Sequence, residues 1–244
     1  DNDSFNRIMW NNRSLSLKAF LEGPFNGSTM NTTLNGILPI SHPYNVTLPY
    51  FGGTPEWYYT GAGSVTTIPN VNIVDWILVD LRDATSAVAA TPAASIAKFP
   101  AFILNNGTIV GLNGSSNIEF TNTITNNLYV VIFHRNHQSI MSANPLPYTT
   151  GVYTYDYSTG AAQVYGGSAG HKLLGSGIWG MRSGDGNGNG DILLNDKTQV
   201  WGISTQLGKT GYLPSDFNFD RQTNNKDKND KWLPNNNTYS QVPN

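Results

Sequence analysis

The chain has 244 residues and a formal net charge of −2, and only 12% of its residues are charged. Nucleic acids and anionic membrane surfaces are bound through clustered Lys and Arg, so this charge balance argues against both as partners. The absence of cysteine excludes a disulfide framework and a cysteine zinc site. Because so few residues are charged, the polar surface must consist largely of Asn, Ser, Thr, Gly and Tyr, as in β-rich extracellular chains.

Alternation of apolar and polar residues from about Ser14 to Tyr165 predicts β-strands. The clearest are SLSLKAFLEG, VDWILVDLRD and LYVVIFHRNHQSIMSA. AFILNNGTIVGLNG predicts a hairpin that turns at Asn106-Gly107, and GVYTYDYSTGAAQVYGG predicts a second. Many short antiparallel strands favour an Ig-like β-sandwich over a barrel, and we expect it to span residues 1–165.

The N-terminal segment, residues 1–13, begins DNDSFNRIMW and precedes the first clear strand. It lacks the charged and apolar regions of a signal peptide, and no stretch of about 18 apolar residues follows it in the chain. We expect an N-terminal extension or a strand that is exchanged with a neighbour's sheet edge, and no membrane insertion.

Catalytic arrangements are scarce in this sequence. His134 and His137 in HRNH would point to opposite faces of one strand, so we expect structural, hydrogen-bonded roles rather than a shared metal ion. Nothing in the sequence arranges a Ser-His-Asp triad. Three aspartates on or just after one strand are interpreted as solvated strand-end residues, although sequence does not show whether any of them meets a second carboxylate at the separation that hydrolysis needs; they are Asp75, Asp80 and Asp83. We expect a noncatalytic protein.

Three consecutive aromatic residues lie in the loop TPEWYYTGAG: Trp57, Tyr58 and Tyr59. Exposed aromatic rings in a row are typical of sugar-stacking platforms, whereas buried ones pack at a sheet edge. The sequence leaves both interpretations open, with edge packing favoured.

Beyond residue 166 the chain becomes Gly-rich, and two segments align with each other at a spacing of 31 residues. Placing GDGNGNGDILLNDKTQVW over SDFNFDRQTNNKDKNDKW matches Asp185 with Asp216, Asp196 with Asp227, and Trp201 with Trp232. Aspartates among the glycines would repel phosphate, and a flexible linker has no reason to repeat aspartates in register. The repeat predicts one supersecondary unit used twice.

The spacing of oxygen-bearing side chains fits a 12-residue calcium loop. Such a loop takes ligands at positions 1, 3, 5, 7, 9 and 12 and a turn glycine at position 6. The first loop places Gly190 at position 6 and these residues at positions 1, 3, 5, 7 and 12: Asp185, Asn187, Asn189, Asp191 and Asp196. The second loop places Asp216, Asn218, Asp220 and Asp227 at positions 1, 3, 5 and 12, but Arg221 replaces the turn glycine.

Asp rather than Glu at position 12, and a loop followed by a helix without an incoming helix, resemble a dockerin, the calcium-binding unit at the ends of secreted bacterial enzymes and surface proteins. The resemblance implies two calcium ions and extends the second ligand set to Gln222, while Arg221 and Thr223 depart from the pattern. No cohesin-recognition pair is visible, so cohesin binding does not follow.

The order of motifs LEGPFN, NIVDWILVDLRD, LYVVIFHRNHQSIMSA, VYTYDYSTG and IWGM before the repeated loops is similar to a module near the C-terminus of large secreted and surface proteins of Bacteroidota. That resemblance implies an extracellular structural or adhesive role. We therefore expect a sandwich at 1–165, a connector at 166–183, and a small α-helical, dockerin-like unit at 184–244 with two calcium loop-helix repeats.

The expected function is that of a noncatalytic, extracellular or cell-surface, calcium-binding structural protein. Calcium would supply folding free energy to a C-terminal segment that has few apolar residues. Within this class we expect a self-associating surface or fibre subunit. The alternatives are an anchoring module of a larger secreted protein and a carbohydrate-binding adhesive sandwich.

Overall fold

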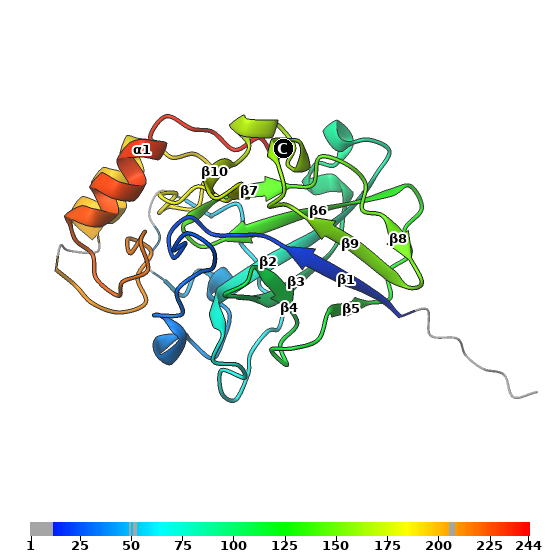
Figure 1. Cartoon of the computed structure of the whole chain (residues 1–244), viewed down its shortest axis with the longest axis horizontal. Coiled ribbons are helices and arrows are strands. Elements are labelled where there is room, and N and C mark those ends of the chain that lie inside the picture. Colours follow the sequence, from blue (N-terminus) through cyan, green and yellow to red (C-terminus); the bar gives the residue numbers. More distant parts are fainter. Residues whose placement is uncertain (1–11, 49, 51–52, 205–207) are drawn as a thin grey trace, which may run out of the picture.

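The computed structural model describes residues 12–48, 50, 53–204 and 208–244. Most regular structure in these ranges is β-strand (Figure 1). The strands are β1 (Arg13–Lys18), β2 (Ile73–Ala84), β3 (Ser95–Leu104), β4 (Thr108–Val110), β5 (Ile118–Phe120), β6 (Asn127–His134), β7 (His137–Met141), β8 (Tyr148–Thr149), β9 (Val152–Asp156), β10 (Lys172–Gly175) and β11 (Ile178–Gly180).

Helical segments are few and short. The 3₁₀ turns are Asn35–Ile37, Pro43–Asn45, Ala87–Ala89, Pro92–Ala94, Ala161–Gln163 and Gly167–Ala169. Near the C-terminus lie two segments with π-type hydrogen bonding, η7 (Asp196–Ser204) and η8 (Asp227–Trp232), and α1 (Leu233–Asn235) continues η8. Within the described ranges, no helix has both the length and the apolar character that crossing a membrane requires.

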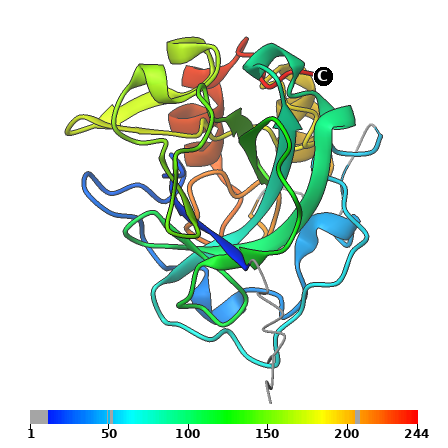
Figure 2. The ribbon, with the colours of Figure 1, turned by 90° about the vertical axis from the view of Figure 1, so that its right-hand side faces the viewer.

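Nine of the described strands form a single sheet in the order β7-β6-β2-β3-β4-β1-β9-β8, with β5 also pairing with β1. The long strands curl into a half-barrel, as Figure 2 shows from one end. Most neighbours are antiparallel, but β1 and β9 run parallel with Leu15 opposite Tyr153. The predicted hairpin at Asn106-Gly107 is confirmed as the β3–β4 turn, with Gly107 at φ +87°.

The predicted Ig-like sandwich is wrong, because one curled sheet replaces two facing sheets. Strand β2 is buried along almost its whole length, since loops and the C-terminal residues pack onto the sheet. Trp76 Nε1 donates to the Pro39 carbonyl at 2.8 Å, and Arg82 Nη1 donates to the Pro243 carbonyl at 2.9 Å. Alternation shows that a strand has a buried face, but it does not say which strands pair.

The segment around β9 and the Gly-rich connector also differ from expectation. β9 pairs with β8 and β1 instead of forming the second predicted hairpin with the residues that follow it. The connector expected at 166–183 contains the two-stranded β10–β11 hairpin. The N-terminal extension lies outside the described residues up to residue 11, and β1 begins at Arg13.

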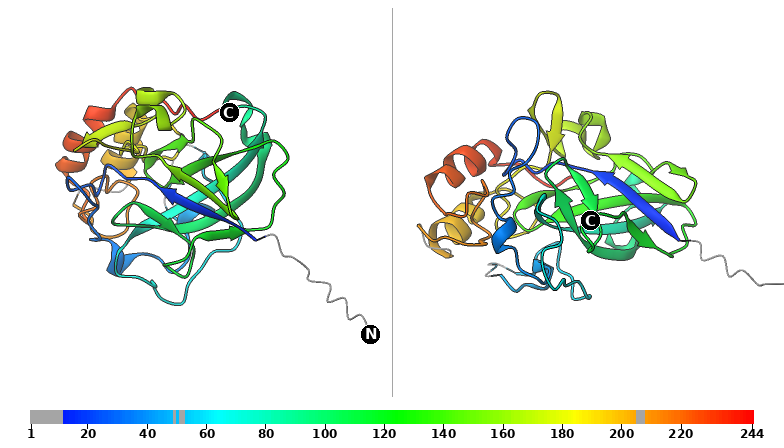
Figure 3. Two further views of the ribbon diagram at one scale, coloured as in Figure 1. Left: turned by 45° about the vertical axis from the view of Figure 1, so that its right-hand side comes forward. Right: turned by 60° about the horizontal axis from the view of Figure 1, so that its bottom comes forward.

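The predicted dockerin-like helical unit is also wrong. Segments η7 and η8 lie side by side at one end of the sheet (Figure 3), but the apolar cluster beneath them has four members: Ile192, Trp201, Phe217 and Trp232. So small a cluster does not support an independent helical unit. Phe219 from the second loop joins the main core of the sheet, so the C-terminal segment folds onto the β-structure.

Candidate functional site

The first repeated loop, residues 185–196, wraps its main-chain amides around two aspartates. Asp185 accepts hydrogen bonds from the amides of Gly188, Asn189 and Gly190 at 2.9 to 3.1 Å. The carboxylate of Asp196 accepts from three further amides, at 2.8 to 3.2 Å, from Gly186, Asn187 and Leu193. The glycines allow this close winding, since Gly188 and Gly190 adopt φ of +72° and +87°.

The second loop, residues 216–227, repeats this arrangement 31 residues later. Asp216 accepts from the amides of Asp220 and Arg221 at 3.1 and 2.9 Å, and Asp227 accepts from those of Phe217 and Asn218 at 2.7 and 3.2 Å. In both loops the side chains at the third and fifth positions accept from the amide two residues on: Asn187, Asn189, Asn218 and Asp220. The sequence repeat is therefore also a repeat of three-dimensional structure.

Arg221 occupies the position that glycine holds in the first loop and adopts φ of +72°. A left-handed conformation costs a non-glycine residue roughly 1 kcal/mol. The side chain is held in place, because its Nε donates to the Thr33 carbonyl at 2.6 Å. The second loop thus keeps the backbone path of the first and gains a link to the loop before β2.

The carboxylates at the two ends of each loop are buried. Asp185 is 2% exposed, and Asp196, Asp216 and Asp227 are fully buried. Among the residues that the structure describes, none of the four forms an ion pair with a basic side chain. Burial costs an ionised carboxylate several kcal/mol unless its charge is balanced.

Burial therefore shifts the pKa values of these groups upward. Burial and the nearby Asp196 carboxylate hold the pKa of Asp185 well above its usual range. Burial raises the pKa of Asp196 to about 6, that of Asp216 to about 7, and that of Asp227 to about 6. The ionised form of these carboxylates is therefore disfavoured in the folded loops, and a cation beside them would stabilise it.

No group of three or more His, Asp or Glu side chains in the described part of the chain converges closely enough to hold a metal. A site in these loops must therefore draw on the amide oxygens of Asn and on main-chain carbonyls as well as on carboxylates. That mixture suits a hard cation, and the absence of cysteine disfavours a soft one. The buried, unpaired aspartates fit calcium as the group to be held.

A loop far away in sequence contacts the first calcium-type loop, and sequence analysis missed it. The Glu56 amide donates to the Gly188 carbonyl at 2.7 Å, and Ser139 Oγ donates to the Glu56 carboxylate at 3.0 Å. Burial raises the pKa of Glu56, and the nearby Asp191 adds to this shift. Nothing in the sequence signalled the contact, because about 130 residues separate the two loops.

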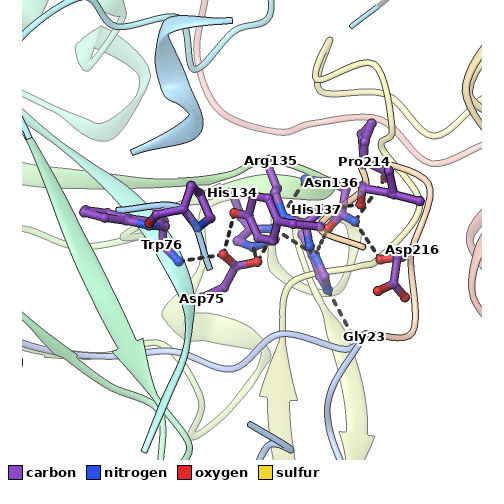
Figure 4. Close-up of polar contacts among 12 residues, drawn as sticks. Gly23, Asp75, Trp76, His134, Arg135, Asn136, His137, Pro214 and Asp216 are labelled. Carbon is purple, nitrogen blue, oxygen red and sulfur yellow. Dashed lines mark hydrogen bonds and ion pairs between the residues drawn. The ribbon is translucent and has the colours of Figure 1, made fainter. Parts of the chain in front are cut away.

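The histidines of HRNH lie at the tight turn between β6 and β7 (Figure 4). His137 Nε2 accepts from the Gly23 amide at 3.0 Å, so its Nδ1 carries the proton and donates to His134 Nδ1 at 3.0 Å. His134 Nε2 then donates to Asp75 at 3.2 Å. The argument that the rings face opposite sides is wrong, because the turn brings them together, but the rings do form hydrogen bonds as expected.

Asp75 is the centre of this network rather than a solvated strand-end residue. It receives hydrogen bonds from Arg135 Nε at 3.0 Å and from Tyr212 Oη at 2.6 Å, and Asp75 and Arg135 are both fully buried. Burial raises the pKa of Asp75, but Arg135 and His134 bring it below its usual value. Asp80 is also buried, in an ion pair with Arg82 at 3.0 Å.

The same turn connects the network to the second loop. Asn136 Nδ2 donates to the carbonyls of Pro214 at 3.1 Å and Asp216 at 2.9 Å, as Figure 4 shows. Arg135 Nη1 donates to the Leu213 carbonyl at 2.5 Å. Burial lowers the pKa values of His134 and His137, so both rings are neutral at pH 7. The cluster is buried and fastens the C-terminal segment to the sheet.

The three aromatic residues predicted as a possible sugar platform do not share a surface. Trp57 is 2% exposed and packs edge-on against Tyr44 and Tyr50, whereas Tyr58 is 42% exposed. Tyr59 is half-buried against His42. Trp57 is therefore buried against aromatic rings of neighbouring loops and does not offer a face for stacking on a sugar.

Comparisons of the chain with protein-family models, curated proteins and solved structures gave no match. The resemblances described above thus depend only on the motifs quoted for them. The functional argument has to come from the geometry of the two loops and of the sheet.

The raised pKa of Asp216 predicts a pH dependence in protein kept free of metal by chelator. With a folded pKa of about 7 and an ordinary value near 3.9, the folded state binds the extra proton between these values, so stability falls as pH rises through this range. Asp216→Asn removes the titration. We therefore compare the free energy of unfolding of Asp216→Asn with that of the wild type at two pH values. The difference, variant minus wild type, should be larger at pH 7.5 than at pH 5 by on the order of 2 kcal/mol.

Urea unfolding of the wild type and of Asp216→Asn at both pH values measures this double difference. His134 and His137 contribute in the opposite direction, because their lowered pKa values make the folded state more stable as pH rises. Both histidines are present in the wild type and in the variant, so their contribution cancels in the double difference. Equal effects of the substitution at pH 5 and pH 7.5 would contradict the assigned shift.

Proposed function

We propose that this chain is a noncatalytic, calcium-binding structural protein of the cell surface or extracellular space, in which two cations hold residues 184–244 onto the curled sheet. One observation carries the proposal. Two 12-residue loops of different sequence adopt the same hydrogen-bond arrangement around buried aspartates that form no ion pair with a basic side chain in the described structure.

The residues that would hold the cations are those at the ligand positions of the two loops. Carboxylate and amide oxygens with a main-chain carbonyl form the kind of ligand set that calcium accepts at 6 to 8 oxygens. The first set is Asp185, Asn187, Asn189, Asp191 and Asp196, and the second is Asp216, Asn218, Asp220, Gln222 and Asp227. Calcium supplies positive charge there and performs no reaction.

Calcium binding would stabilise the whole fold because each loop is tied to the sheet. Gln138 Nε2 donates to the Gly190 carbonyl of the first loop at 2.9 Å, and Asn136 donates to the Asp216 carbonyl of the second. Ordering either loop therefore also orders its contact with strand β7 or with the turn before it. A cation that binds the folded loop but not the unfolded chain adds its binding free energy to folding.

The noncatalytic and extracellular parts of the proposal have separate support. The titratable cluster around Asp75, His134 and His137 is at most 1% exposed at each of these residues, so its side chains are closed off from a substrate. The low charge, the many Asn and Thr residues and the absence of cysteine in this chain suit a secreted structural protein that calcium, rather than disulfides, stabilises.

Titration calorimetry with calcium tests the proposal. We expect two ions per chain for the wild type and one for each of Asp185→Asn and Asp216→Asn, because each substitution removes a buried carboxylate from one loop. Asp230→Asn, which changes an exposed aspartate in η8, is the control and should still bind two ions. Absence of binding to the wild type, or two ions bound by both loop variants, would refute calcium as the ligand of these loops.

A further inference from the structure

The curled sheet splits open between the first half of β3 and β5. β3 pairs with β2 along its length, but on its other side it meets β4 only at Phe102 and Ile103. β5 pairs with β1 through Ile118–Phe120, and its other edge has no strand partner among the described residues. Two strand edges thus face a common gap.

This gap is a groove on the protein surface. Its larger part has a cavity volume of about 490 Å³ and includes in its lining Lys98, Pro100, Ile118 and Glu119 from the two strands, with Tyr59 and Leu112 from neighbouring loops. An adjoining hollow of about 350 Å³ shares Phe99 and Glu119 with it and reaches Asn12. We call the two hollows together the β3–β5 groove.

One end of the β3–β5 groove is closed by side chains. Asn122 Nδ2 donates to the Ile96 carbonyl at 3.0 Å, and Arg13 Nη1 donates to the Asn122 carbonyl at 2.9 Å. The unpaired edge of β3 therefore runs from about residue 97 to residue 101, a length of about 17 Å for five extended residues.

An extended peptide is the ligand that such a groove suits. An unpaired strand edge offers main-chain acceptors, and donors at each residue except Pro100, that an added strand satisfies. Side-chain pockets along the groove select every second residue. Tyr59, Phe99 and Leu112 supply partly buried apolar surface, while Lys98 and Glu119 supply one charge of each sign.

We propose that the β3–β5 groove binds residues 1–11 of a second copy of this chain as an added strand. These residues precede Asn12 in the chain, and Asn12 itself lines the groove. Eleven extended residues reach about 36 Å, enough to cross to a neighbour and pair with five residues of β3. The segment carries apolar Phe5, Ile8, Met9 and Trp10 and both charge signs.

The chain's own segment is a poorer occupant of its own groove. To enter, it would have to reverse direction around the end of β5, where the Arg13–Asn122–Ile96 hydrogen bonds close the groove. Donation to a neighbour is head-to-tail, and every copy has one donor segment and one groove, so assembly continues beyond a dimer into an open chain or a closed ring of subunits. The proposal is independent of calcium binding.

Light scattering on the full-length chain with calcium present, as a function of concentration, tests this proposal. A donor variant, Ile8→Asp with Trp10→Asp, retains an intact groove, and a groove variant, Leu112→Asp, retains an intact donor. We expect the wild type to grow into large species and each variant to stay at 26.6 kDa. Mixing the two variants should give one-to-one heterodimers only, because one donor and one groove are left to pair.

Because Leu112 is partly buried, Ala62→Arg at an exposed position of the groove lining serves as a second groove variant, and thermal unfolding verifies that each variant is folded. A wild type that is monomeric at all concentrations, whether through self-occupation or an empty groove, overturns the proposal. Variants that assemble like the wild type, or a mixture that does not form heterodimers, overturn it as well.

Discussion

Asp75→Asn is expected to lower the free energy of unfolding by about 3 to 5 kcal/mol, the cost of removing one partner of a buried ion pair. Asp75 and Arg135 are fully buried, and their 3.0 Å contact neutralises both charges. The amide that replaces the carboxylate would leave the guanidinium charged in the interior, since Arg stays protonated there. Urea unfolding at pH 7 with calcium present measures the loss.

Asp230→Asn, an exposed change of the same chemistry, is the matched control and should alter stability by less than about 0.5 kcal/mol. The pair can be isolated further with Arg135→Met. If the two residues act as a pair, Arg135→Met costs less in the Asp75→Asn background than in the wild type. A loss below about 1 kcal/mol for Asp75→Asn would show that the network does not stabilise the fold as argued.

Removal of calcium by a chelator is expected to lower the free energy of unfolding of the wild type. The loss should be about 2.7 kcal/mol or more for each loop, if the calcium concentration before chelation is at least a hundred times the Kd of that loop. The reason is that buried aspartates in both loops then lose the cation that balances their charge, while no ion pair replaces it in the described structure. Thermal unfolding in excess calcium and in excess chelator measures the difference.

The double variant Asp185→Asn/Asp216→Asn is the control for chelation. It has lost a carboxylate from each loop, so its melting temperature should be the same with calcium and with chelator. A wild type whose melting temperature is unchanged by chelator would refute the stabilising role, even if calcium binds weakly at the surface.

Short-range features of the C-terminal loops could be predicted from the sequence. The 31-residue spacing and the positions of Asp185, Gly190 and Asp196 predict a loop wound around its own carboxylates, and the amide hydrogen bonds show such winding. Even the strained position is visible in sequence, because Arg221 stands where a glycine is expected. All these contacts join residues at most ten positions apart.

The network around Asp75 shows where sequence reasoning fails. The sequence pattern puts His134 and His137 on one strand, but a turn between them brings both rings to the same side. Asp75 looks like any polar residue of an alternating strand, yet Arg135, 60 residues later, pairs with it. No local pattern indicates a contact over this separation.

Three features follow from the sequence alone: the richness in β-strands, the turn at Asn106-Gly107, and the two aspartate-containing loops that repeat near the end of the chain. Hydrogen bonding and backbone sterics over a few residues decide these features. Three other features are visible only in the tertiary structure. The strands form one curled sheet in which β1 is parallel to β9, the repeated loops pack onto this sheet, and a groove opens beside β3. Those outcomes depend on long-range burial, where many strand pairings satisfy the same alternation and packing selects one.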